Sequence, residues 1–141
     1  MADIERTVRI ARAPEDVRAF VLDPAAQTRW QANLVEFVKT TPGPSGLGTR
    51  QRGAVAIAGR RLVWRAEIVQ WDEHGYTVRS VDSQPSFSVR WTFTAAGGGT
   101  EVTYEQSSPA LRGIAGALTR QVVGRMADRD LATLRALLEG G

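Results

Sequence analysis

The middle of the chain constrains the fold most, because residues 49–108 contain five apolar–polar alternations separated by very short connections. The turn-forming runs Gly59-Arg60 and Gly97-Gly98-Gly99 are two of these connections. Connections this short join antiparallel neighbours, so the segment predicts a β-meander. The expected strands cover residues 49–59, 61–72, 75–82, 85–95 and 100–107.

One face of this meander is apolar and rich in aromatic side chains. The apolar positions of the fourth expected strand are Phe87, Val89, Trp91 and Phe93, and polar residues alternate with them. Successive side chains of a strand point to opposite faces, so one face is apolar and the other wet. An apolar face of this kind requires a second layer of structure to cover it.

The C-terminal segment is long enough to be that cover. Ser108 fits a helix N-cap and Pro109 fits the first helical position, so a helix is expected to begin there. It would continue for about 29 residues to Leu138, which is roughly 43 Å at 1.5 Å per residue. Its apolar positions recur at helical spacing: Leu111, Ile114, Ala115, Leu118, Val122, Met126, Leu131, Leu134 and Leu138.

The N-terminal part adds two strands and two short helices. Residues 4–10 alternate as a strand, and residues 33–41 return to strand. Between them, one helix begins near Pro14 and a second covers residues 25–31 and carries Trp30. The whole order predicts an α+β fold with a seven-stranded antiparallel sheet and one long C-terminal helix.

Length and composition narrow the possible classes of function. A chain of 141 residues suits a single domain over residues 1–141. There is no cysteine and His74 is the one histidine, so we expect no metal site. The eighteen basic residues are spread along the chain and the net charge is +3, so we expect no nucleic-acid partner.

Hydropathy and the N-terminal residues indicate where in the cell the protein is expected. The longest apolar run, Ala54 to Ala58, is five residues, whereas a membrane-spanning helix needs about twenty. Asp3 and Glu5 lie where a secretory signal would carry basic residues. We therefore expect a cytoplasmic protein with no membrane span.

Several short segments resemble one known superfamily. They are Val8 to Val17, Asp23-Pro24 with Trp30, Gly46 to Arg50, Trp91 to Phe93, and Gly99 to Tyr104. The chain resembles the START-like, Bet v 1-like superfamily, also described as the polyketide cyclase/dehydrase and lipid-transport group (SRPBCC), over essentially its whole length. The resemblance implies a helix-grip fold, in which a curved sheet wraps around the C-terminal helix and leaves a cavity between them.

Strand parity names the side chains that would line the implied cavity. From the sheet they are Val55, Ile57, Trp64, Ile68, Phe87, Val89, Trp91, Tyr104 and Gln106, from the helix Leu118, Val122 and Met126, and near the mouth Trp30. For any one aliphatic residue, a place in a solid core is the better interpretation. Buried tryptophan, tyrosine and glutamine side chains need hydrogen-bond partners, which favours a pocket with polar anchors.

These residues predict a protein that binds a hydrophobic or polycyclic small molecule, lipid or polyketide-like, without a cofactor. The alternative is an aromatase/cyclase-type enzyme whose cavity folds a polyketide-like chain for ring closure. Tyr104 would then be the acid, with Gln106 or Arg6 polarising a carbonyl, and no base is visible in the sequence. A third possibility is an interaction protein that holds no ligand. The sequence does not indicate an oligomeric state.

Three glycines fall within the expected long helix, namely Gly113, Gly116 and Gly124. Each costs about 1 kcal/mol relative to alanine in a helix interior. Close packing against the sheet and a loosened helix that admits a ligand both explain them. A loosened helix predicts that Gly116→Ala stabilises the protein.

Overall fold

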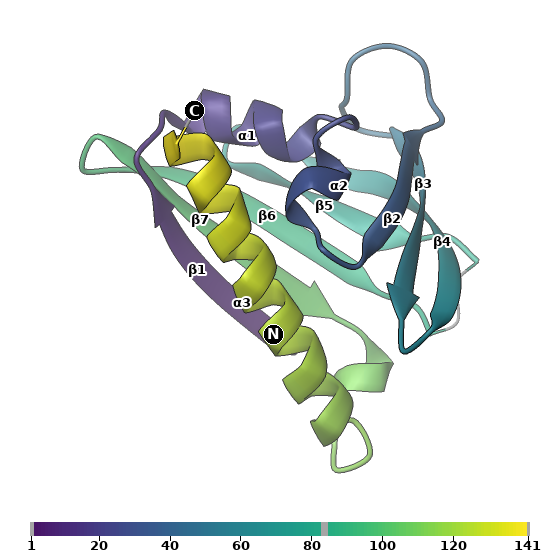
Figure 1. Cartoon of the computed structure of the whole chain (residues 1–141). Coiled ribbons are helices and arrows are strands. Elements are labelled where there is room, and N and C mark those ends of the chain that lie inside the picture. Colours follow the sequence, from purple (N-terminus) through teal and green to yellow (C-terminus); the bar gives the residue numbers. More distant parts are fainter. Residues whose placement is uncertain (1, 83–84, 141) are drawn as a thin grey trace.

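A computed structural model describes residues 2–82 and 85–140 (Figure 1). The elements in chain order are β1 (Ile4–Ile10), α1 (Pro14–Leu22), α2 (Gln27–Trp30), β2 (Leu34–Lys39), β3 (Arg50–Ile57), β4 (Arg60–Trp71), β5 (Gly75–Ser80), β6 (Ser88–Ala96), β7 (Gly99–Ser107), the 3₁₀ turn η1 (Pro109–Leu111) and α3 (Ala117–Gly140). The strands form one antiparallel sheet in the order β1-β7-β6-β5-β4-β3-β2. This confirms the expected helix-grip architecture.

The turns explain why the strands of the meander pair with their sequence neighbours. Ala58 and Gly59, between β3 and β4, have φ angles of +51° and +76°. Gly97 and Gly98, between β6 and β7, have φ angles of +51° and +81°. Two central residues with positive φ match the hairpin turns whose twist suits the flanking strands.

The sheet is curved and the helices lie on its concave side (Figure 1). Register shifts interrupt the pairing of β2 with β3 near Leu34 and that of β4 with β5 near Ile68. Irregularities of this kind increase strand twist and bend a sheet. α3 contacts β1, α1 contacts β6 and β7, and α2 contacts both β2 and α3.

The hydrophobic core joins the sheet to α1 and to the C-terminal half of α3. Val17 and Val21 of α1 and Leu131, Leu134 and Leu138 of α3 are buried against sheet residues that include Ile10, Phe93 and Val102. Beyond this core, α1 and α2 border the concave space that the sheet leaves open. Over the described ranges, no helix is both long and apolar enough to cross a membrane.

The C-terminal helix is shorter than the sequence predicts. Ser108 does cap a turn, since its Oγ accepts a hydrogen bond from the Ala110 N–H at 3.4 Å, but that turn is η1. Gly113 then has a φ of +67°, a left-handed conformation that ends the turn. The expected start at Pro109 is therefore wrong, and α3 begins at Ala117.

Candidate functional site

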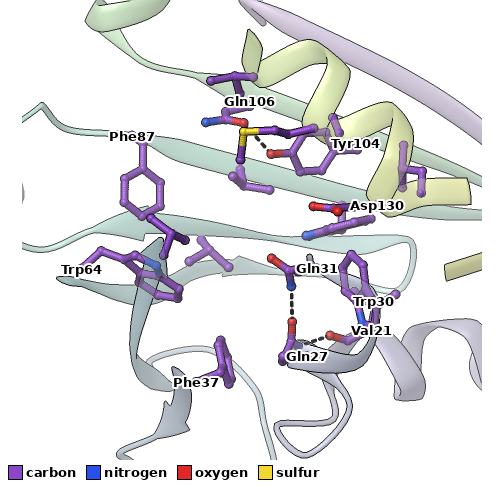
Figure 2. Close-up of a pocket in the computed structure, with 18 of the residues that line it drawn as sticks. Val21, Gln27, Trp30, Gln31, Phe37, Trp64, Phe87, Tyr104, Gln106 and Asp130 are labelled. Carbon is purple, nitrogen blue, oxygen red and sulfur yellow. Dashed lines mark hydrogen bonds between the residues drawn. The ribbon is translucent and has the colours of Figure 1, made fainter. Parts of the chain in front are cut away.

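A cavity of about 310 Å³ lies between the concave face of the sheet, α2 and α3 (Figure 2). It is partly open to solvent. The side chains around it are Val21, Gln27, Trp30, Gln31, Phe37, Gln51, Val55, Ile57, Trp64, Tyr76, Val78, Phe87, Val89, Trp91, Tyr104, Gln106, Val123, Met126, Ala127, Asp130 and Leu131. Most of these side chains are apolar, as in other small-molecule sites.

Two groups of aromatic rings form opposite parts of the cavity wall. Trp91 packs edge-to-face on Trp30, with ring centroids 5.7 Å apart, and on Tyr104 at 5.0 Å. Trp64 packs on Phe37 at 5.9 Å and edge-to-face on Phe87 at 6.0 Å. Perpendicular and tilted pairs of this kind hold each ring in a defined orientation. The wall is therefore built from rings that support one another.

Hydrogen bonds organise the polar groups of the cavity. The Tyr104 hydroxyl donates to Gln106 Oε1 at 2.5 Å. Gln31 Nε2 donates to Gln27 Oε1 at 2.5 Å, and Gln27 Nε2 donates to the Val21 carbonyl (Figure 2). Trp30 Nε1–H is buried and has no acceptor in the part of the chain that the structure describes. A buried N–H of this kind is a group that a bound ligand could satisfy.

Asp130 places a carboxyl group in this apolar wall. Its side chain is 17% exposed. Oδ1 accepts hydrogen bonds from the Ala32 backbone N–H at 3.2 Å and from Arg129 at 3.3 Å. Burial raises the pKa of Asp130, and these two donors only partly oppose that rise. Burial, and then the nearby Asp130 charge, raise the pKa of Tyr104, so its hydroxyl is a hydrogen-bond donor at neutral pH.

The structure brings ten of the thirteen residues expected at the cavity to its lining. They are Trp30, Val55, Ile57, Trp64, Phe87, Val89, Trp91, Tyr104, Gln106 and Met126. Ile68 does not line it, because this side chain is fully buried in the core, where its neighbours fill the space in front of it. The expectation for Ile68 is therefore corrected.

Two helix residues expected at the cavity also lie elsewhere. Leu118 is 72% exposed and Val122 is 45% exposed, because the first turns of α3 lie outside the core. Val123, Ala127 and Asp130 occupy the helix face that meets the cavity instead. The sequence pattern predicts the wrong face of the helix at the cavity, because the apolar stripe includes Leu111 and Ile114, which precede α3.

The expectation that Arg6 polarises a bound carbonyl is corrected by the position of its side chain. Its Nε pairs with Asp128 Oδ1 at 2.7 Å, and a guanidinium nitrogen donates to the Glu5 carbonyl at 3.0 Å. It does not line the cavity. Its inward parity brings it against α3 near Gly124, where an added Cβ would lie 2.6 Å from the guanidinium. The side chain therefore ties β1 to the outer side of the helix.

The sequence pattern did not identify Asp130 as a site residue. A signal was present, because Asp130 follows Met126 by four residues and therefore shares its helix face. Gln27, Gln31 and Phe37 were also missed, since α2 and β2 reach the cavity only through tertiary packing. Among residues 2–82 and 85–140, no group of three histidine, cysteine, aspartate or glutamate residues could hold a metal ion.

The curved sheet, the C-terminal helix and the cavity between them define a START-like, helix-grip protein. The family model "Polyketide cyclase / dehydrase and lipid transport" matches residues 1–139. The chain belongs to this family. No protein with a curated description matches the sequence.

Solved structures share the fold at low sequence identity. A START superfamily protein from Mycobacterium smegmatis superposes with a TM-score of 0.83 at 16% identity, over 97% of both chains. A protein from Thermus thermophilus has a TM-score of 0.74 at 21% identity, over 97% of this chain and 94% of that one. The di-domain ARO/CYC StfQ from the steffimycin biosynthetic pathway has a TM-score of 0.76 at 14% identity, over 97% of this chain and 50% of that one.

Proposed function

We propose that the protein binds a hydrophobic, aromatic or polycyclic small molecule in the cavity between the sheet, α2 and α3. The observation that carries this proposal is the composition of the cavity wall, which combines two aromatic groups with a few polar side chains. Its volume of about 310 Å³ lies at the lower end of the usual range for small-molecule sites, about 300–1,000 Å³. Family membership supports the same reading.

Tryptophan fluorescence tests the proposal without knowledge of the natural ligand. Trp91 borders the cavity, whereas Trp71 is 37% exposed and is not among the described residues that line it. An apolar aromatic probe should quench the emission saturably. Trp91→Phe should remove much of that response, and the matched control Trp71→Phe should leave it unchanged.

The absence of quenching would overturn the proposal. If no probe quenches the wild-type emission below about millimolar concentration, which corresponds to roughly −4 kcal/mol, the cavity is not a ligand site. The protein would then be an interaction protein that uses the fold without a ligand. Equal loss of quenching in both variants would place the probe outside the cavity.

A second candidate function is an aromatase/cyclase-type reaction in the same cavity. The observation that favours it is that Tyr104, a neutral hydroxyl able to donate a hydrogen bond to a carbonyl, and Asp130, a carboxyl group with a raised pKa, line one cavity. A linear poly-β-ketone should then give an aromatic product, detected by its ultraviolet absorbance. Tyr104→Phe should slow that reaction while leaving probe binding intact.

A further inference from the structure

The cavity lining carries an unusual charge for this protein. Seventeen of the eighteen basic residues in the sequence are arginine, yet none of the described residues that line the cavity is arginine, lysine or histidine. Asp130 supplies the formal charge of that lining. A ligand carboxylate or phosphate would therefore meet a negative charge and no positive one.

The two oxygens of the Asp130 carboxylate have different surroundings. Oδ1 accepts the hydrogen bonds from Ala32 and Arg129, while Oδ2 accepts none from the described part of the chain. Figure 2 shows the carboxyl group at the edge of the cavity, between Tyr104 and Trp30. Oδ2 is thus the acceptor that remains for a ligand, since a carboxylate can accept several hydrogen bonds.

Trp30, Trp91 and Tyr104 line the same cavity as this acceptor. Trp91 stands nearly perpendicular to Trp30, at 85°, and lies at 64° to Tyr104. Rings set at such angles present π-faces in more than one direction. Ammonium groups are attracted to the faces of tryptophan and tyrosine, and the attraction strengthens where water is excluded.

We propose that the ligand of this cavity is an amine, in which an apolar aromatic body carries a protonated nitrogen that donates to Asp130 Oδ2 beside Trp30, Trp91 and Tyr104. This inference rests on the proposed function and specifies its ligand class. A cation at Oδ2 adds to the partial compensation that Arg129 gives the buried carboxylate, whereas an anionic ligand would bring a second negative charge against it.

The charged and titratable neighbours of Asp130 leave this role open. Arg129 on the same helix is 47% exposed, and both of its contacts with Asp130 go to Oδ1. It also donates to Asn33 Oδ1 at 2.5 Å, which directs the guanidinium away from the cavity. Tyr104 faces Asp130 from β7 as a neutral hydroxyl. Arg129 thus offsets part of the carboxylate charge through Oδ1, and neither group donates a hydrogen bond to Oδ2.

Calorimetric titration of three matched probes tests the proposal: 2-(2-naphthyl)ethylamine, 2-ethylnaphthalene and 2-naphthylacetate at neutral pH. The amine should bind the wild type about tenfold or more tightly than the neutral hydrocarbon, and the acid should bind most weakly. Asp130→Asn should reduce the preference for the amine over the hydrocarbon to about twofold.

Asp128→Asn is the matched control. Asp128 lies two residues away on α3, is 58% exposed and pairs with Arg6 outside the cavity, so this variant should keep the full preference. The wild-type ranking of the three probes tests the charge selectivity even if Asp130→Asn folds poorly.

The outcomes separate this inference from the proposed function. If the hydrocarbon binds but the amine binds no more tightly, the cavity is a ligand site and the amine proposal is wrong. Retention of the preference by Asp130→Asn also overturns it. Failure of all three probes to bind overturns the proposed function, and the amine inference with it.

Discussion

The carboxyl group of Asp130 is held in a largely buried position that disfavours its charged form. Burial raises its pKa in the folded protein, and the Ala32 N–H and Arg129 do not fully offset this. A carboxyl whose folded pKa exceeds its unfolded pKa reduces stability once it ionises. Residues that reduce the stability of the folded protein in this way are typical of ligand-binding and catalytic sites.

Asp130→Asn should therefore raise the thermal unfolding temperature at neutral pH. The asparagine Oδ1 can still accept the hydrogen bond from the Ala32 N–H, and the charge whose burial Arg129 offsets only in part is gone. The increase should shrink as the pH falls toward about 4, because the carboxyl is then protonated in both states. Thermal unfolding followed by circular dichroism over this pH range measures the difference. A lower unfolding temperature at neutral pH would contradict the argument.

At the scale of elements, the glycines before and within α3 have different roles. An added Cβ at Gly116 would lie 2.5 Å from the Arg112 N and O atoms, which are backbone and cannot move away alone. Gly116 also accepts a hydrogen bond from the Arg120 N–H at 2.8 Å, so it lies where the chain enters α3. Close packing of the chain on itself explains this glycine, which favours the packing interpretation over the loosened helix.

Gly116→Ala should destabilise the protein by about 1–3 kcal/mol, the usual cost of forcing atoms into occupied space. Gly124→Ala is the control within α3. Its Cβ would meet only the end of the Arg6 side chain, which can shift, and alanine favours the helix by about 1 kcal/mol. The control should be close to neutral. Chemical denaturation measures both, and stabilisation by Gly116→Ala would contradict the prediction.

At the scale of the whole molecule, carboxylates connect segments that are distant in the sequence. Asp3 accepts a hydrogen bond from the Ser108 N–H at 3.0 Å and pairs with Arg112 at 3.1 Å. Glu139 accepts from the Ala11 N–H at 2.9 Å. These donors lower the pKa of Asp3 and of Glu139 below their usual values.

The stability that these carboxylates contribute should be lost in acid. A lowered folded pKa stabilises the protein above the unfolded value and ceases to do so as the pH falls through the folded value. The urea midpoint should therefore drop as the pH is lowered from about 5 to about 2. The double variant Asp3→Asn, Glu139→Gln should start lower and show a shallower decline. If the urea midpoint of the double variant declines in the same way, other titratable groups cause the acid sensitivity.

Strand alternation is a local property, and it was sufficient to assign much of the sheet. Because successive side chains of a strand point to opposite faces, the pattern alone placed Trp64, Trp91 and Tyr104 on the inward face. Turn chemistry was equally local, since Gly59 and Gly97 take the positive φ angles that hairpins need. The pairing of sequence neighbours from β3 to β7 followed from these two features.

Only the tertiary structure decided which parts of each element meet the cavity. Leu118 and Asp130 both lie on α3, yet the leucine is 72% exposed and the side chain of the acid is only 17% exposed. Arg6 has the inward parity of a cavity residue, yet its guanidinium forms an ion pair with Asp128 of α3. Periodicity fixes the direction of a side chain relative to its own element. What lies in that direction depends on contacts between residues more than one hundred positions apart, which no local pattern encodes.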